Sequence, residues 1–238
     1  MQVTINCDMG EGMGDDAAIM PFIQSANIAC GYHAGDMENM RNTIALCMEH
    51  GVAIGAHPSF YDRENFGRKE FELPVHELYE LVIQQLLLIN EMAESMGALL
   101  QHVKPHGALY NLSARDLITA RCIARAVKDF DSRLILVGLS GSHSITEASI
   151  MGLATASEVF ADRSYQEDGS LTPRSVTGAM ITDTATMLAQ VQQIINEGTV
   201  TSLQGQIIPL HADTICIHGD GPHALPFAQA IHQLLFTA

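Results

Sequence analysis

The stretch QVTINCDMGEG, residues 2–12, places a short apolar run directly before a carboxylate and a pair of glycines. The run predicts a strand over Gln2–Cys7, and Asp8 and Glu11 follow where that strand ends. The same order recurs along the chain. Further strands are predicted over Ala26–Cys30, Val52–Ala56, Leu99–Lys104, Leu134–Gly138, Leu153–Thr155 and Thr214–Ile217. Most of these runs are almost continuously apolar, which is typical of parallel strands that are covered on both faces.

Helical patterns with recognisable ends lie between the strands. Helices are predicted over 36–51, over 74–97, from a capping box at Ser113 and Asp116 through Val127, over 183–198, and from Pro222 to Leu235. Strand and helix alternate about seven times, and no linker or repeat interrupts the alternation. The pattern predicts one α/β domain over residues 1–238, either a (β/α) barrel or a doubly wound sheet.

The composition excludes several classes of function. The 238 residues carry 27 acidic against 12 basic side chains, a net charge of -15, and this charge repels nucleic-acid phosphates and anionic lipid surfaces. The longest apolar stretch, Leu81–Ile89, is interrupted by Gln84 and Gln85 and is far too short to span a membrane. Asp8 stands where a signal peptide needs apolar residues. The five cysteines form no CxxC pair, so we expect a reduced, cytoplasmic protein in which they fill apolar space.

Ionisable residues cluster directly after the predicted strands. Four histidines lie within three residues of a strand end, namely His33, His57, His106 and His218. The carboxyl ends of the strands in a parallel barrel all face one mouth, so we expect these segments to converge on a single cleft. The residues expected to share it are Asp8, His33, His57, Lys104, His106, Asp162, Arg163, His218 and Asp220.

Plainer roles exist for individual members of this set. A single loop histidine is most often structural, and Asp8, Glu11, Asp36, Asp162 and Asp220 suit the first turn of a following helix. The chain has no GxGxxG after the first strand, no GxxxxGK[ST] and no HExxH. The sequence therefore indicates a polar cleft without a recognised nucleotide-binding loop.

Six ordered motifs resemble the LamB/YcsF family. They are NCDMGEGMG, SANIACGYHAGD, VAIGAHPSF with its NFGR continuation, HVKPHGALYN, EVFADRSYQEDGSL and ICIHGDGPHAL, and together they run from Asn6 to Leu225. The resemblance implies an irregular seven-stranded (β/α) barrel similar to the glycoside hydrolase/deacetylase superfamily. It also implies ATP-dependent cleavage of the cyclic amide 5-oxo-L-proline (pyroglutamate) to L-glutamate, with ATP as co-substrate of a complex that contains the 5-oxoprolinase subunits B and C.

That reaction suggests roles for the clustered residues. Phosphorylation of the amide oxygen would activate the lactam, and hydrolysis then needs a base for water, donors for phosphate and an acid for the ring nitrogen. The catalytic candidates are Asp8, His33, His57, His218 and Asp220. The candidates for binding substrate or phosphate are Glu11, Asp36, Lys104, His106, Asp162 and Arg163.

Two alternatives remain open from the sequence. The chain could be a metal-dependent deacetylase or amidohydrolase that acts alone, with a divalent metal bound by Asp8, His33 and His57. It could also be a non-catalytic protein that binds a lactam within a complex, although such a protein would need few acid and base groups.

Overall fold

Seven parallel strands close into a barrel in the computed structural model, which describes residues 3–13, 15–219, 221 and 223–236. The strand order is β1-β2-β3-β4-β5-β6-β9. The strands are β1 Thr4–Met9, β2 Ser25–Ala29, β3 Ala53–His57, β4 Leu100–Val103, β5 Ile135–Leu139, β6 Ala154–Phe160 and β9 Thr214–His218. β1 pairs with β2 on one side and with β9 on the other, and this pairing closes the ring. The predicted seven-stranded barrel is confirmed, and the doubly wound alternative is wrong.

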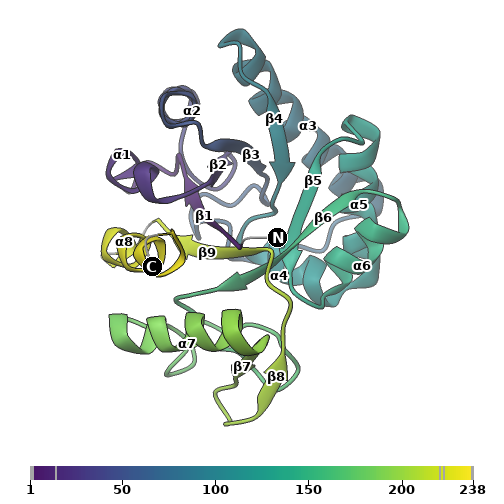
Figure 1. Ribbon diagram of the computed structural model, residues 1–238. Coiled ribbons are helices and arrows are strands. Elements are labelled where there is room, and N and C mark those ends of the chain that lie inside the picture. The colour runs from purple at the N-terminus through teal and green to yellow at the C-terminus, as the bar shows by residue number, and fades with distance from the viewer. Residues whose placement is uncertain (1–2, 14, 220, 222, 237–238) are drawn as a thin grey trace.

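Helices surround the barrel, as Figure 1 shows. They are α1 Asp16–Ile19, the 3-10 helix η1 Met20–Phe22, α2 Met37–His50, α3 Val75–Ser95, α4 Gly107–Arg115, α5 Leu117–Phe130, α6 His143–Ile150, α7 Thr184–Glu197 and α8 Ala224–Phe236. The local sequence explains their ends. The Asp36 carboxylate accepts hydrogen bonds from the backbone of Glu38 and Asn39 at the start of α2, and Gly51 ends that helix in the left-handed region.

The structure corrects several predicted boundaries. Ser113 is not part of a capping box, because it lies inside α4 and its hydroxyl donates to the Tyr110 carbonyl. Asp116 alone caps α5, by accepting from the Thr119 backbone N–H. Helices α1, η1, α4 and α6 were not predicted, and the strand predicted to end at Thr155 continues for five more residues to Phe160 as β6. Pro222, the predicted start of the last helix, lies outside the described residues.

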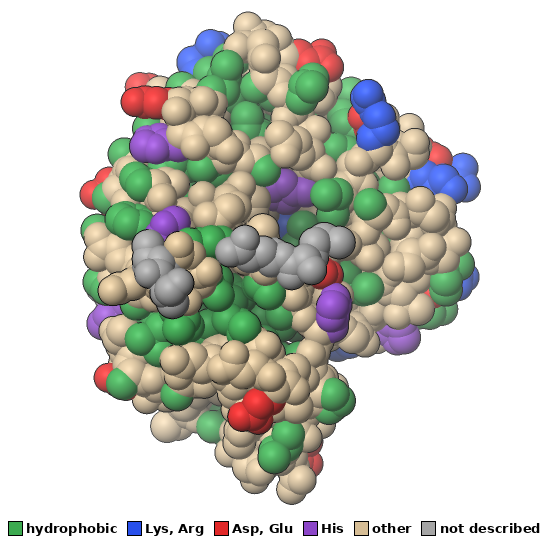
Figure 2. Space-filling model, in the orientation of Figure 1, with side chains coloured by type: hydrophobic (Ala, Val, Ile, Leu, Met, Phe, Trp, Pro, Cys, Tyr) green, Lys and Arg blue, Asp and Glu red, His purple; other side chains and the backbone are tan. Residues whose placement is uncertain are grey.

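A small antiparallel hairpin lies beside the barrel. It consists of β7 Thr199–Thr201 and β8 Ile207–Pro209, and it follows α7 in the chain (Figure 1). Figure 2 shows hydrophobic side chains gathered between α7 and α8 on this side of the molecule. None of the helices in the described ranges is long and apolar enough to cross a membrane.

Candidate functional site

A row of hydrogen-bonded polar side chains from neighbouring strands lies inside the barrel. Alternation along β1 turns Asn6 and Asp8 to the same face. The Asn27 side-chain amide on β2 donates to Asn6 Oδ1 at 2.8 Å and to Asp8 Oδ1 at 2.9 Å, and Asn27 Oδ1 lies 2.8 Å from Nε2 of His102. The His102 ring occupies space that a side chain at Gly55 would fill, so this strand position requires glycine. Burial, followed by the Lys104 charge, lowers the pKa of His102 to about 3, so its ring is neutral.

Lys104 is a buried cation, with 2% of its surface exposed. Its Nζ lies 2.8 Å from Asp8 Oδ1, 2.8 Å from Glu158 Oε1 and 3.1 Å from Cys216 Sγ. Burial opposes the charge on the amine, but Asp8, Cys216 and Glu158 together hold the pKa of Lys104 well above its usual range. Burial likewise opposes the charge on Asp8, yet His57 and Lys104 hold the pKa of this carboxyl well below its usual range. Asp8 is therefore ionised and fixed between Lys104 and the histidines.

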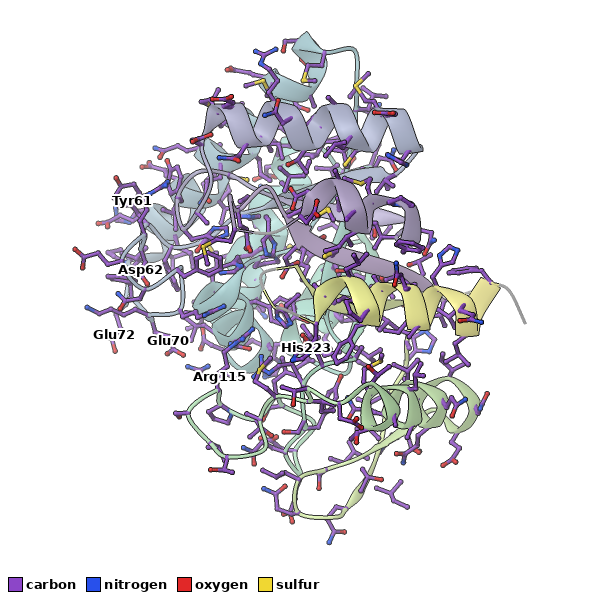
Figure 3. The ribbon with its side chains drawn as sticks, turned by 90° about the vertical axis from the view of Figure 1, so that its left-hand side faces the viewer. Tyr61, Asp62, Glu70, Glu72, Arg115 and His223 are labelled. Atoms are coloured by element: carbon purple, nitrogen blue, oxygen red, sulfur yellow. The ribbon has the colours of Figure 1, made fainter. Side chains whose placement is uncertain are left out.

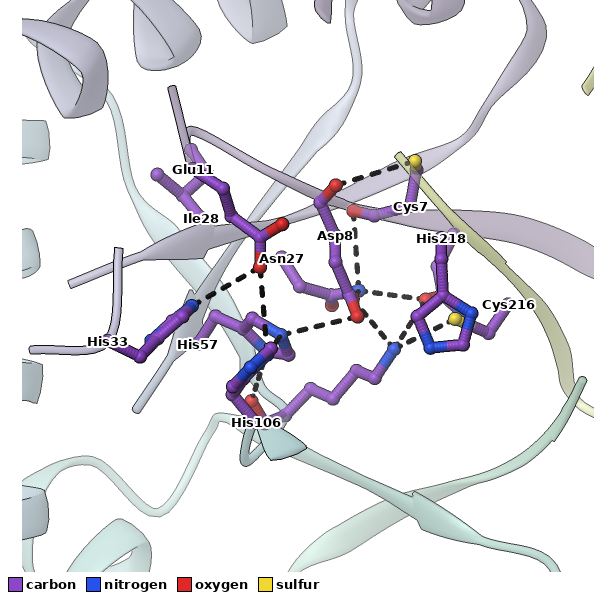
Figure 4. A network of polar contacts seen from close by, with 12 residues as sticks. Cys7, Asp8, Glu11, Asn27, Ile28, His33, His57, His106, Cys216 and His218 are labelled. Carbon is purple, nitrogen blue, oxygen red and sulfur yellow. Dashed lines mark hydrogen bonds and ion pairs between the residues drawn. The ribbon is translucent and has the colours of Figure 1, made fainter. Parts of the chain in front are cut away.

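Three histidines and Glu11 form a second group beside Asp8 (Figure 4). His57 Nε2 lies 3.3 Å from Asp8 Oδ2 and 2.9 Å from His106 Nδ1. The His33 and His106 rings stack at 3.8 Å between centroids, and Glu11 Oε1 lies 3.2 Å from His33 Nε2. Burial is the main cause that lowers the pKa values of His33 and His106. The described residues contain another set of possible metal ligands, which consists of Asp8, Cys216 and His218.

The NFGR motif supports the stacked histidines. The Phe66 carbonyl accepts a hydrogen bond from His106 Nε2 at 2.9 Å. Gly67 has φ +67, and a Cβ there would meet His106 Cδ2 at 2.8 Å and His33 Cβ at 2.9 Å. The Asp62 carboxylate holds the loop by accepting from the backbone N–H groups of Asn65 and Lys69. This loop thus fixes the ring positions of both histidines.

A cavity of about 940 Å³ opens at the carboxyl ends of the strands. Asp8, His57, Lys104, His106, Arg163 and His218 line it. Its outer wall includes Arg68, Arg174 and the pair Glu70 and Arg115, which lie side by side in Figure 3 with their charged atoms 2.5 Å apart. Basic side chains are scarce in this acidic protein, so their number here favours an anionic ligand.

The other candidates lie behind the cavity wall or away from it. His33 stacks against His106, Glu11 contacts His33, and Asp162 accepts from His218 Nδ1 at 2.9 Å. Asp36 is an exposed helix cap. Asp220 lies outside the described residues.

Three residues of the charged interior were not among the predicted site residues, namely Asn27, His102 and Glu158. Each is a polar residue within a parallel barrel strand, and a polar residue in a strand that is covered on both faces was the available signal. Ser142, at the start of α6, was missed as well, and its buried hydroxyl has no hydrogen-bond partner among the described residues. It lines the cavity together with Arg163, whose buried Nε has no such partner either.

The fold and the cavity define a (β/α)-barrel protein with a charged ligand site at the carboxyl ends of its strands. The LamB/YcsF family matches residues 3–238, and the chain belongs to that family. It is 51% identical to the 5-oxoprolinase A subunit of Bordetella pertussis, over 98% of this chain and 94% of that relative. The same values hold for the 5-oxoprolinase A subunit of Bordetella parapertussis. The lactam utilization protein of Thermus thermophilus has a TM-score of 0.92 and 41% identity, covering 100% of this chain and 97% of that one.

Proposed function

We propose that this chain is the A subunit of an ATP-dependent 5-oxoprolinase, which opens 5-oxo-L-proline to L-glutamate together with subunits B and C. The observation that carries the proposal is the 51% identity, over nearly the whole chain, to relatives that are named as A subunits of 5-oxoprolinase. The name of the Thermus protein, lactam utilization protein, supports the same substrate class. We place the complex in the cytoplasm, a compartment that suits five free, buried cysteines.

ATP enters this scheme through the partner subunits. They transfer the γ-phosphoryl group to the lactam oxygen and release ADP, and the phosphorylated lactam then passes to the barrel. Water adds to the ring carbon, and the ring nitrogen takes a proton as its C–N bond breaks. A second water releases phosphate from the resulting acyl phosphate. The C–N bond must break before phosphate leaves, since loss of phosphate from the closed ring only regenerates 5-oxoproline.

The residues of the cavity fit these steps. Asp8, held ionised beside His57 at 3.3 Å, is the base for water. Lys104 and Arg163 bind the phosphoryl group, because both are cationic and line the cavity. His218, whose Nδ1 is held by Asp162, delivers the proton to the ring nitrogen.

A glutamate-release assay tests the proposal. The chain alone is expected to release no glutamate from 5-oxoproline, whereas the chain with subunits B, C and ATP does. Asp8→Asn should lower the rate by about 10²–10⁴, as expected for loss of a general base. Asp183→Asn is the matched control, because Asp183 caps α7 and asparagine caps equally well. Wild-type turnover by Asp8→Asn, or glutamate release without ATP, would refute the scheme.

A metal-dependent amidohydrolase that acts alone is the second candidate. One observation favours it, namely the group of Glu11 with three histidines whose ligand atoms lie within 4.8 Å of one another. It predicts ring opening by the isolated chain with a divalent metal and without ATP.

A further inference from the structure

Two imidazole nitrogens in the histidine group, His57 Nε2 and His106 Nδ1, face each other directly. His57 Nδ1 lies 2.7 Å from the Lys104 carbonyl oxygen, and His106 Nε2 lies 2.9 Å from the Phe66 carbonyl oxygen. A carbonyl oxygen only accepts, so His57 Nδ1 and His106 Nε2 each carry a hydrogen. Without a further proton, His57 Nε2 and His106 Nδ1 would present lone pairs to each other across 2.9 Å. Lone pairs this close need a cation beside them.

Glu11 adds a third electron-rich atom to this pair. Its Oε1 lies 3.6 Å from His106 Nδ1 and 3.2 Å from His33 Nε2. A carboxylate only accepts, so His33 donates from Nε2, and its Nδ1 has no partner among the described residues. His33 thus orients Glu11, as the Lys104 carbonyl orients His57 and the Phe66 carbonyl orients His106. Metal ligands are held in this way by outer hydrogen bonds that fix tautomer and direction.

We propose that Glu11 Oε1, His57 Nε2 and His106 Nδ1 bind one divalent transition-metal ion, with His33 as a positioning residue. Two imidazoles and one carboxylate are a recurrent ligand set for Zn²⁺ and related ions, with further positions open to solvent or substrate. Bonds of about 2.0–2.1 Å place tetrahedral ligand atoms about 3.3 Å apart. The pairs at 2.9 Å and 3.6 Å bracket that spacing.

The charges of the interior agree with a dication at this place. Asp8, Glu11 and Glu158 are buried carboxylates, and Lys104 is the ammonium among them. The other set of possible ligands, Asp8, Cys216 and His218, already has a cation, because Lys104 Nζ contacts Asp8 and Cys216 directly. The ion therefore belongs with Glu11, His57 and His106 rather than with Cys216.

This site keeps Asp8 in the base role that the sequence suggested and removes it from the metal ligands. Asp8 Oδ2 lies 3.3 Å from His57 Nε2, so it stands beside the ion as a base rather than among its ligands. This consequence rests on the proposed function, whereas metal binding itself does not. A binding experiment can therefore fail or succeed independently of the glutamate-release assay.

The test uses the full chain, stripped with a chelator and titrated with Co²⁺ and Zn²⁺. We expect saturable binding of about one equivalent by calorimetry and elemental analysis. The Co²⁺ spectrum should show d–d bands of a low-symmetry site and no thiolate-to-cobalt charge transfer. A thiolate band would place the ion at Cys216 and overturn the assignment. Absence of saturable binding would also overturn it and leave a shared proton as the cation between the two rings.

Substitutions locate the ligands. His57→Gln and His106→Gln should each weaken Zn²⁺ binding by about 100-fold or more, and His33→Gln by about 10–100-fold, the usual effect of losing an outer partner. His76→Gln is the matched control, since 74% of that side chain is exposed on α3. Circular dichroism confirms that each variant is folded. Unchanged affinity in folded His57→Gln and His106→Gln would refute the ligand set.

Discussion

Replacing Lys104 by methionine removes the one ammonium that contacts both Asp8 and Glu158. Its Nζ lies 2.8 Å from a carboxylate oxygen of each, and all three side chains are buried. Methionine keeps most of the side-chain volume, so the substitution tests charge rather than packing. The two carboxylates would then share the interior without the ammonium that now lies between them.

The expected loss of stability is large. Breaking a buried ion pair by removing one partner costs about 3–5 kcal/mol, and a chain of this size loses roughly 2–4 °C in Tm for each kcal/mol. Lys104→Met should therefore lower Tm by about 6–20 °C. The pKa of Asp8 is depressed in the folded wild type, so its stabilising contribution is present above its unfolded pKa and fades as the pH falls. In the variant the pKa of Asp8 rises. The difference in unfolding free energy between wild type and variant should therefore become smaller at acidic pH.

Urea unfolding at pH 7 and pH 5 measures this difference. The double variant Lys104→Met/Glu158→Gln should recover about half of the lost stability or more, while glutamate release stays low. Lys128→Met is the matched control, because Lys128 is exposed and should change stability by less than about 0.5 kcal/mol. A Lys104→Met chain as stable as wild type, or a double variant no more stable than the single one, would refute the charge argument.

Three further predictions concern the walls of the site. Gly67→Ala should cost about 1–3 kcal/mol more than Gly51→Ala by chemical unfolding, since both glycines have positive φ but the Gly67 Cβ would meet the side chains of Ser59, His106 and His33, whereas the Gly51 Cβ would meet nothing in the described part of the chain. The His102 pKa of about 3 lies below the unfolded value, so its contribution to stability is lost as the pH falls below about 6.5. His102→Gln should therefore reduce the stability change between pH 7 and pH 5 by about 2 kcal/mol, whereas the exposed His76→Gln leaves it unchanged. Arg163→Met should weaken inorganic phosphate binding by about tenfold or more in calorimetry, and equal affinity would remove Arg163 from the phosphate site.

The barrel was predictable because its strands repeat one pattern. Continuous apolar runs such as 52–56 and 214–217 appear where both faces of a strand are covered. Helix α4 was missed because a polar residue lies at a position inside the helix. Ser113 is buried inside α4 and donates to its own backbone, so a residue typical of a helix start lies within a helix instead. Serine in a helix interior cannot be distinguished from a cap without the tertiary contacts.

The charged interior was only partly predictable. Strand-end residues such as His57 and Lys104 carry a positional signal that sequence reasoning can use. Lys104 directly follows β4 and Glu158 lies on β6, so their ion pair joins two strands that are not neighbours in the barrel. The choice of ring nitrogen in His57 and His106 depends on carbonyl groups from two different loops. The spacing of residues along the chain predicts neither this ion pair nor the choice of ring nitrogen.

The fixed charge of Asp8 has a consequence for the pH dependence of the proposed reaction. A general base limits the rate in acid only when the pH approaches its own pKa. The pKa of Asp8 lies well below the usual carboxyl range, because His57 and Lys104 stabilise the ionised form even though burial opposes it. Asp8 therefore stays ionised at every pH at which histidines titrate in the unfolded chain. Asp8→Asn should therefore lower the rate across the whole pH range, and an acidic limb of the wild-type profile that lies above the usual carboxyl range would report a group other than Asp8.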